Sequence, residues 1–349
     1  MKKTYWNNLM ELKKQMGKVS NTPYTLFAKV LTLVTLNMRY EKIAFNKNVK
    51  GHPYELTRQI VLDAQAQFSI LMDTAFIEKD DKRILGGKSL RKDVKHQDLF
   101  DQIWNRYGKK DYKIYVDRYV HRIKVNKLES LIRGKRCVDM GCGNGNFPIA
   151  LLKCGSSLSA GVDFGKNSIA YAQKAAKELG VANKTDFRNE SVYKTSFKND
   201  SFDFAVQNGV YHHLENEPLA LKETCRILKR GGWFWYYTDG EGGISYDLWD
   251  TSVEILKNVP VICIENILKL INVRTEKIAH IMDGLSATYA HTSWDKATQK
   301  LSRYGFGNFK RLTGGFDTDF DLDRIQSDAY GKEKFGEGDL RILCQLIKK

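Results

Sequence analysis

Apolar residues recur at helical spacing through much of the first 128 residues. Over residues 54–77 they fall three or four positions apart, which is the period of an amphipathic helix. Further helices are predicted over 97–107 and 112–132. The most apolar N-terminal run, 24–36, contains Lys29 and is shorter than the roughly 20 residues that cross a bilayer. It is therefore predicted to form a buried or interfacial helix.

From residue 136 the pattern changes to short apolar strands that alternate with helical segments. The predicted strands cover 136–140, 157–163, 185–188, 202–207 and 233–238. The predicted helices between them cover 147–153, 168–179 and 218–228. Such alternation is typical of βαβ units around a largely parallel sheet. Two later strands, 308–312 and 340–347, would complete a seven-stranded sheet of the α/β class.

Residues 239–292 interrupt this rhythm with an apolar helix predicted over 259–273, and the helix–strand order resumes with a helix over 294–304. Four segments are therefore expected. They are a helical N-terminal region with a lead-in helix (1–128), a Rossmann-like core (129–240), a helical insertion that would cap the substrate (241–292) and the end of the core (293–349).

The first chemical signal is a glycine turn after the first strand, where Gly141, Gly143 and Gly145 follow Asp139. A strand that ends in such a turn beneath a helix N-terminus lets a nucleotide-like ligand approach bare backbone. The spacing is G-x-G-x-G and not the G-x-G-x-x-G of dinucleotide sites. This spacing disfavours a dinucleotide oxidoreductase.

Three further elements follow in order. Asp163 ends the second strand, where a carboxylate can accept both ribose hydroxyls; capping of the next helix is the alternative. The loop 188–192 could contact an adenine edge or be a plain polar loop. The segment 208–214 contains His212 and His213, each of which could be a catalytic base or serve in capping or packing.

In this order the elements resemble class I S-adenosylmethionine-dependent methyltransferases, in particular the small-molecule type 11 group that includes ubiquinone and menaquinone enzymes. The resemblance covers about 130–240 and continues more weakly over 293–349. The segments that carry it are 138–145, 161–163, 201–204, 210–214 and 223–232.

The resemblance implies S-adenosyl-L-methionine as cofactor and a Rossmann-like methyltransferase sheet. The residues it implies for cofactor binding are Asp139, Gly141, Cys142, Gly143, Asn144, Gly145, Asp163, Phe164, Ser191, Val192 and Asn208. The family usually has an acid at the position of Ser191. Either Glu190 replaces that acid, or the backbone alone contacts adenine.

Methyl transfer from a sulfonium needs mainly alignment and exclusion of water, and it needs a general base only for a protonated nucleophile. The candidate bases are His212, His213, Asp239 and His291. On the lead-in helix, Tyr115, Arg118 and Arg122 could close over the cofactor's carboxylate or cover the first helix of the core.

The formal charge of +15, from 56 basic and 41 acidic residues, is compatible with an RNA methyltransferase. The basic residues are scattered, however, and no RNA-binding module is evident, so a small-molecule acceptor is favoured over nucleic acid. A non-catalytic scaffold with this fold is a further alternative. The spacing of the six cysteines predicts buried thiols in a reducing cytoplasm, with neither disulfides nor a metal site. No secretory signal is expected, and the helical N-terminal region could support a homodimer.

Overall fold

The computed structural model describes residues 1–46, 49–73, 109–257, 259–273 and 290–348, together with Ile278, Ile281, Met282 and Leu285. The chain divides into two compact units. The helical unit comprises Met1–Leu90, Gly242–Ser286 and Arg324–Gly336. The sheet unit comprises Arg91–Glu241, Ala287–Asp323 and Glu337–Lys349. The helix predicted over 97–107 and the last residues of the one predicted over 54–77 lie outside the described residues.

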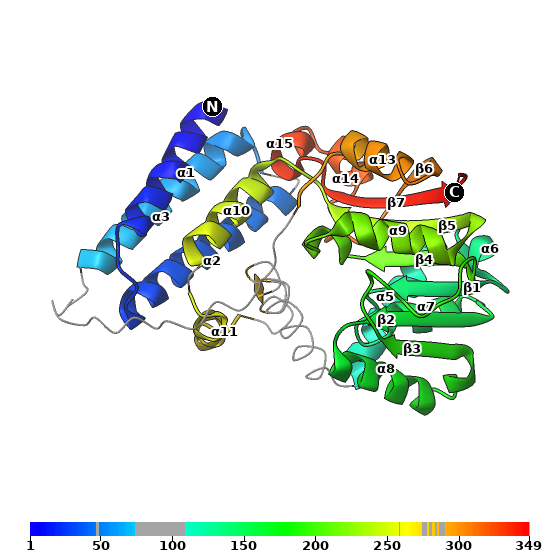
Figure 1. The fold of residues 1–349 in the computed structure, drawn as a ribbon. Coiled ribbons are helices and arrows are strands. Elements are labelled where there is room, and N and C mark those ends of the chain that lie inside the picture. Colours follow the sequence, from blue (N-terminus) through cyan, green and yellow to red (C-terminus); the bar gives the residue numbers. More distant parts are fainter. Residues whose placement is uncertain are drawn as a thin grey trace. The chain divides into compact units, whose positions relative to one another are not determined.

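The sheet unit is built on one seven-stranded sheet in the order β3-β2-β1-β4-β5-β7-β6 (Figure 1). The strands are β1 Arg136–Met140, β2 Leu158–Asp163, β3 Thr185–Asn189, β4 Phe202–Asn208, β5 Leu228–Asp239, β6 Phe306–Leu312 and β7 Asp339–Leu346. The first five are parallel, and β7 pairs antiparallel with both β5 and β6. This is the predicted seven-stranded α/β fold, which the structure confirms.

Apolar side chains on both faces of the sheet explain why helices cover both sides. In β4, Phe204 and Val206 belong to one buried cluster, whereas Ala205 between them belongs to the other. This is the alternation expected of a strand buried on both faces. The helices and helical turns of the unit are α5 Lys109–Val125, α6 Glu129–Ile132, α7 Asn146–Lys153, α8 Lys166–Glu178, η1 Ala182–Lys184, η2 Tyr211–His213, α9 Glu217–Ile227 and α13 Trp294–Ser302. Helices α5, α7 and α8 contribute to the first cluster, and α9 and α13 to the second.

Two local predictions were wrong. The strand predicted over 233–238 begins earlier, at Leu228, because Gly231 and Gly232 lie inside β5, where the β4–β5 register shifts between Phe202 and Phe204. Gly231 adopts a φ of +81°, so the glycines allow a bulge and the strand continues. The single helix predicted over 112–132 is two helices, α5 and α6, because Lys127 between them has a φ of +56° and ends the first helical run.

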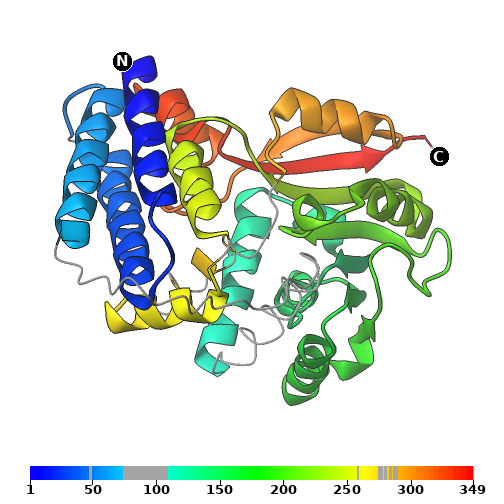
Figure 2. The same cartoon turned by 60° about the vertical axis from the view of Figure 1, so that its left-hand side comes forward.

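The helical unit packs α1 Lys2–Gly17, α2 Pro23–Phe45 and α3 Pro53–Asp73 against α10 Ile244–Leu256, and these helices lie side by side in Figure 2. It also contains α11 Val261–Leu270 and α15 Gly331–Phe335, while α14 Leu322–Ser327 crosses the boundary between the units in sequence. Pro23 and the Thr22 capping box start α2, which contains the predicted helix over 24–36. Among the described helices, none is long and apolar enough to cross a membrane.

The division into units follows different boundaries from the four segments expected from sequence. Helix α5, expected with the N-terminal region, belongs to the sheet unit. Residues 324–336, expected with the end of the core, belong to the helical unit. In α5, Val116 and Ile123 are buried in the same cluster as residues of α7, which explains its place with the sheet.

Candidate active site

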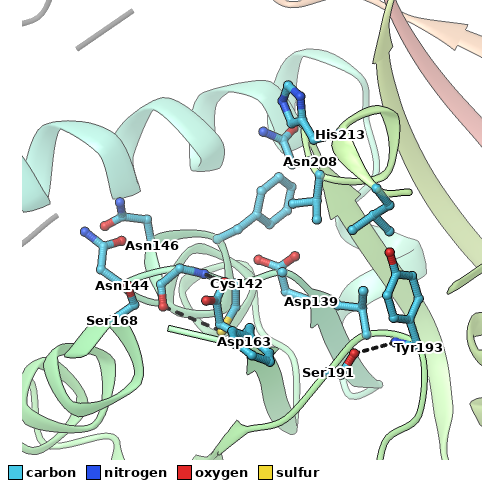
Figure 3. Close-up of a pocket in the computed structure, with 18 of the residues that line it drawn as sticks. Asp139, Cys142, Asn144, Asn146, Asp163, Ser168, Ser191, Tyr193, Asn208 and His213 are labelled. Carbon is cyan, nitrogen blue, oxygen red and sulfur yellow. Dashed lines mark hydrogen bonds between the residues drawn. The ribbon is translucent and has the colours of Figure 1, made fainter. Parts of the chain in front are cut away.

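A cavity of about 200 Å³ opens in the sheet unit where β1, β2 and β4 end. Its walls consist of Tyr119, Asp139, Gly141, Cys142, Gly143, Asn144, Asn146, Phe147, Asp163, Phe164, Ser168, Ser191, Val192, Tyr193, Asn208, Gly209, Val210, His213 and Leu214. In Figure 3, Asn144, Asn146 and Ser168 gather on one side, Ser191 and Tyr193 on another, and Asn208 lies beside His213. The carboxyl ends of parallel strands are the usual place for ligands in open α/β sheets.

The glycine turn forms one wall of this cavity. Gly141, Gly143 and Gly145 all have positive φ angles of +100°, +50° and +83°. A Cβ on Gly141 would lie 2.5 Å from Cγ2 of Val210, so a side chain does not fit there. Gly145 is absent from the cavity wall among the described residues, and a Cβ there would lie 2.9 Å from Ala172. This third glycine therefore allows the turn that starts α7 to pack closely against Ala172 of α8. The first two glycines expose their backbone to the cavity.

Asp163 fixes the glycine turn through its carboxylate. Oδ2 accepts a hydrogen bond from the backbone N–H of Gly143, and Oδ1 accepts one from Gly165, each at 2.8 Å. The second contact holds Gly165, the N-cap residue of α8, but no side-chain hydrogen bond caps this helix, so the contact is not the capping expected as the alternative. Asp163 also lines the cavity, so its carboxylate is placed to meet a ligand there.

Asp139 lies in the same cavity in a contrasting environment. Its side chain makes no hydrogen bond to the described residues, and its buried Oδ1 is without a partner. The residue is only 3% exposed. Burial, with a smaller contribution from the negative charge of Asp163, raises the pKa of this carboxyl well above its usual range.

Three asparagines add further buried polar atoms without partners in the described part of the chain. These atoms are Nδ2 of Asn144, Oδ1 of Asn146 and Oδ1 of Asn208. Asn208 donates through Nδ2 to the hydroxyl of Tyr119 at 3.4 Å, which fixes the direction of its amide. Buried polar atoms are rarely left unpaired unless a ligand or water completes them. Several acceptors, a donor and bare glycine backbone in one cavity suit a ligand that carries an amino acid group, as S-adenosylmethionine does.

The predicted adenine-contacting pair, Ser191 and Val192, lines the cavity together with Tyr193. Oγ of Ser191 accepts a hydrogen bond from the N–H of Tyr193 at 3.2 Å (Figure 3). Glu190 is absent from the described cavity wall, and its Oε2 accepts from the backbone of Ser196 at 2.8 Å. Of the two alternatives for the missing acid, backbone contact therefore suits the geometry better than replacement by Glu190.

The four candidate bases gather near one edge of the sheet, but only His213 reaches the cavity wall. The rings of His212 and His213 lie 3.9 Å apart. The His212 side chain is 3% exposed, and burial lowers the pKa of its imidazole to about 3. His212 is therefore neutral at physiological pH; it packs against His213 and is absent from the described cavity wall.

Asp239 and His291 lie behind this pair. Oδ2 of Asp239 is 3.8 Å from Nε2 of His212, and Oδ1 accepts a hydrogen bond from the hydroxyl of Tyr237 at 3.2 Å. The segment that contains His291 is tied to the same edge, because the N–H of Ala290 donates to the carbonyl of His212 at 3.2 Å. Among the described cavity residues neither Asp239 nor His291 appears, so both are more suited to supporting the edge.

Several cavity residues, most notably Tyr119, were not predicted from the sequence. Its ring packs on Phe147 with centroids 4.4 Å apart, and it lies one helical turn from Tyr115, which was considered. Arg122 does not contact the cavity, because its guanidinium donates to Asp319 at 2.8 Å and to the carbonyl of Gly314. The helical period of α5 would have predicted Tyr119 as a cavity residue only if the face of α5 that packs on the sheet unit had been known.

Residues 138–236 match a protein family described as "Methyltransferase domain". Over 137 residues the chain is 26% identical to a demethylmenaquinone methyltransferase from Bacillus velezensis. This alignment covers 38% of this chain and 58% of that protein. It is 24% identical over 168 residues to a ubiquinone biosynthesis O-methyltransferase from Chromobacterium violaceum, covering 46% of this chain and 70% of the relative. The chain thus spans little more than half of the first of these curated relatives.

A solved structure, the YcgJ protein from Bacillus subtilis, aligns with a TM-score of 0.45 and 17% identity over 67% of this chain and 99% of that protein. The region that matches the methyltransferase family, 138–236, begins in β1 and ends in β5. It therefore contains the glycine turn, Asp163 and the edge of the sheet that carries His213. Over residues 138–236, the chain is thus similar to the methyltransferase domain of this family and of these curated relatives.

Proposed function

We propose that this protein transfers a methyl group from S-adenosylmethionine to a small-molecule acceptor. The observation that carries the proposal is the set of unpaired buried polar atoms of Asp139, Asn144, Asn146 and Asn208 in one cavity beside the glycine turn. Asp163 would accept the ribose hydroxyls, and the backbone around Ser191 and Val192 would contact the adenine.

When bound, S-adenosylmethionine supplies an electrophilic methyl group on a sulfonium that leaves as a neutral thioether. The contribution of the protein is alignment and exclusion of water. Tyr119 and Phe147, in ring contact, form an apolar wall, and Tyr119 orients the amide of Asn208. Where the acceptor is a hydroxyl or an ammonium, an imidazole nitrogen of His213 would take its proton, because His213 is the candidate base on the cavity wall.

The class of acceptor is proposed from two sources. The names of two relatives refer to menaquinone and ubiquinone biosynthesis, which are small-molecule pathways. The cavity also presents aromatic and aliphatic side chains beside His213, including Tyr119, Val210 and Leu214. A small acceptor with an apolar or aromatic body and a methylatable oxygen, nitrogen, sulfur or carbon atom suits these walls.

The test is transfer of label from methyl-labelled S-adenosylmethionine to a panel of low-molecular-weight phenols, quinols, amines and thiols, with total RNA as a separate acceptor. We expect label in at least one small acceptor, with turnover that changes little with salt. Label confined to RNA, with affinity that falls steeply as salt rises, would support the RNA alternative. Binding of the cofactor without transfer to any acceptor would favour the scaffold alternative.

Two expectations from sequence accompany this function as proposals. All six cysteines are free thiols, which suits a reducing cytoplasm. A homodimer through the helical unit would give twice the monomer mass in light scattering at micromolar concentration, and removal of α1 would then shift the mass towards that of a monomer.

A further inference from the structure

We infer that Asp139 is protonated in the cofactor-free protein and releases its proton when the cationic amino group of the methyl donor binds. The inference rests on the proposed function, since it concerns the same cavity. It adds a chemical event to binding. A neutral carboxylic acid becomes a carboxylate that pairs with an ammonium group, and the proton passes to the buffer.

The position of Asp139 carries the first step. The residue lies near the end of β1, between Gly161 of β2 and Val206 of β4 in the strand register. It is 3% exposed yet lines the cavity, and its side chain makes no hydrogen bond to any residue that the structure describes. A buried carboxylate without hydrogen bonds or a countercharge is costly, so the neutral form is favoured until a partner arrives.

Asp163 provides the internal comparison. It lies at the end of the neighbouring strand and lines the same cavity, but its two oxygens accept hydrogen bonds from Gly143 and Gly165 at 2.8 Å. Backbone N–H groups stabilise a carboxylate in its charged form. Of the two carboxyl groups, Asp163 has hydrogen bonds of this kind and Asp139 has none, so Asp139 is the one whose charge depends on the ligand.

The groups that face Asp139 do not neutralise it. From the elements around it, the titratable groups coupled to its charge are Asp163, Tyr119, Tyr211 and Cys142. All four are acids, and within the described residues no lysine or arginine acts on Asp139. Consistent with this, the pKa of Asp139 is raised, first by burial and then by Asp163.

The ligand side supplies the missing cation. Oδ1 of Asn146 and Oδ1 of Asn208 are unpaired acceptors in the same cavity as Oδ1 of Asp139. An ammonium group has three donors and no acceptor, so it can satisfy several oxygens at once. Its charge then stabilises the ionised form of Asp139. Below the pKa of Asp139 in the free protein, the dissociation constant should therefore rise about tenfold for each unit that the pH falls.

The experiment is calorimetric titration of the full chain with S-adenosylhomocysteine, which retains the amino group, in buffers of different ionisation enthalpy at pH 6.5. An α-amino group, with a pKa of about 8, is itself protonated there. The dependence of the binding enthalpy on the buffer gives the protons released. We expect close to one proton for the wild type and close to none for Asp139→Asn, whose affinity should be at least about tenfold weaker.

Asp163→Asn is the matched control, because it weakens binding at the same cavity but should keep the release of a proton. Buffer-independent enthalpy in the wild type, with binding intact, would contradict the inference and leave the proposed function standing. Absence of any binding by the folded wild type would contradict the proposed function itself. Proton release by Asp139→Asn equal to that of the wild type would also overturn the inference.

A second measurement uses the cofactor-free protein, so it does not require the variant to bind the cofactor. A group whose pKa is raised in the folded state stabilises the fold only below its unfolded pKa, and this contribution is lost as the pH rises through the folded pKa. Asp139→Asn should therefore raise the Tm of the cofactor-free protein at pH 7.5, and the gain should vanish near pH 4. A Tm below that of the wild type at pH 7.5 would contradict a protonated Asp139 held at a cost to stability.

Discussion

The two ends of the cavity differ in how their polar side chains are satisfied. At the glycine turn, buried atoms of Asp139, Asn144 and Asn146 have no partner among the described residues. At the edge formed by β4 and β5, Oδ1 of Asn208 is also without a partner among the described residues, but His212 contacts Asp239, and Asp239 accepts from Tyr237. The first end is thus built for a polar ligand, whereas the second satisfies much of its own polarity and presents mainly His213 to the cavity.

This difference indicates that binding of the methyl donor and choice of the acceptor depend on different ends of the cavity. The identity of the methyl donor depends on backbone and side chains fixed by the fold at the glycine turn. We expect the choice of acceptor to depend on a few side chains of α5 and η2 that line the cavity, such as Tyr119 and His213. Changes at the first end should therefore alter donor affinity, and changes at the second should alter turnover.

The largest effect is expected from Gly141→Ala. The added methyl would lie 2.5 Å from Val210 at a φ of +100°, so it would strain the turn and displace a cavity wall. We expect donor affinity to fall by more than about 100-fold, with a loss of roughly 1–3 kcal/mol in the free energy of unfolding. Calorimetry and denaturant unfolding give the two quantities.

Gly180→Ala is the matched control for Gly141→Ala. Gly180 also has a positive φ of +69°, but a Cβ there meets no atom within 4 Å, and it lies away from the cavity. This variant should lose a similar part of the stability that comes from backbone strain and keep the donor affinity. Equal loss of affinity in both variants would show that strain alone, and not the geometry of the turn, governs binding.

The next effect is expected from His213→Ala, which should reduce kcat by about 100-fold or more for an acceptor that must lose a proton. The dissociation constant for S-adenosylhomocysteine should change by less than about threefold, because the donor end is untouched. His121→Ala is the control, since His121 is exposed on α5 and contacts the carbonyl of Gly315 outside the cavity. Unchanged kcat in His213→Ala would remove the histidine from the reaction.

Asp163→Ala should weaken the donor by roughly 10- to 100-fold, because charge-assisted hydrogen bonds contribute about 1.5–3 kcal/mol each. The loss has two parts, the contact with the ribose and the support of Gly143. Asp186→Ala is a suitable control, because Asp186 pairs with Arg188 on β3 and is not in the cavity wall. Affinity of Asp163→Ala within about twofold of the wild type would exclude a role in binding.

The smallest effect on binding is expected from His212→Gln, which should act on stability. Burial lowers the pKa of His212 to about 3, below its value of about 6.5 in an unfolded chain. The unfolded chain therefore binds more protons, so this contribution is complete above pH 6.5 and is lost as the pH falls towards 3. The Tm of the wild type should fall more steeply than that of His212→Gln between pH 6.5 and 4.5. Parallel Tm curves would mean that folding does not lower the pKa of His212.

Strands, helices and the glycine turn could be predicted because local patterns specify them. The alternation of Phe204 and Val206 with Ala205, and the position of Asp163 after an apolar strand, are visible in sequence. The bulge at Gly231 could not be distinguished from a turn, since both use the same glycine conformations.

The completion of the cavity depends on tertiary contacts. Tyr119 lies in the cavity wall because α5 packs on α7. His212 is buried whereas its neighbour His213 lines the cavity, and this difference is not visible in the sequence. The unpaired state of Asp139 likewise follows from what surrounds it in space and not from its motif.

The most direct test of the central claim, that the cavity binds S-adenosylmethionine at the glycine turn, is an equilibrium titration of the purified chain with S-adenosylhomocysteine, monitored by calorimetry. The account predicts one site per chain with a dissociation constant in the micromolar range, and marked weakening in Asp163→Ala. Absence of binding heat up to millimolar ligand, for a protein that unfolds cooperatively, would contradict it.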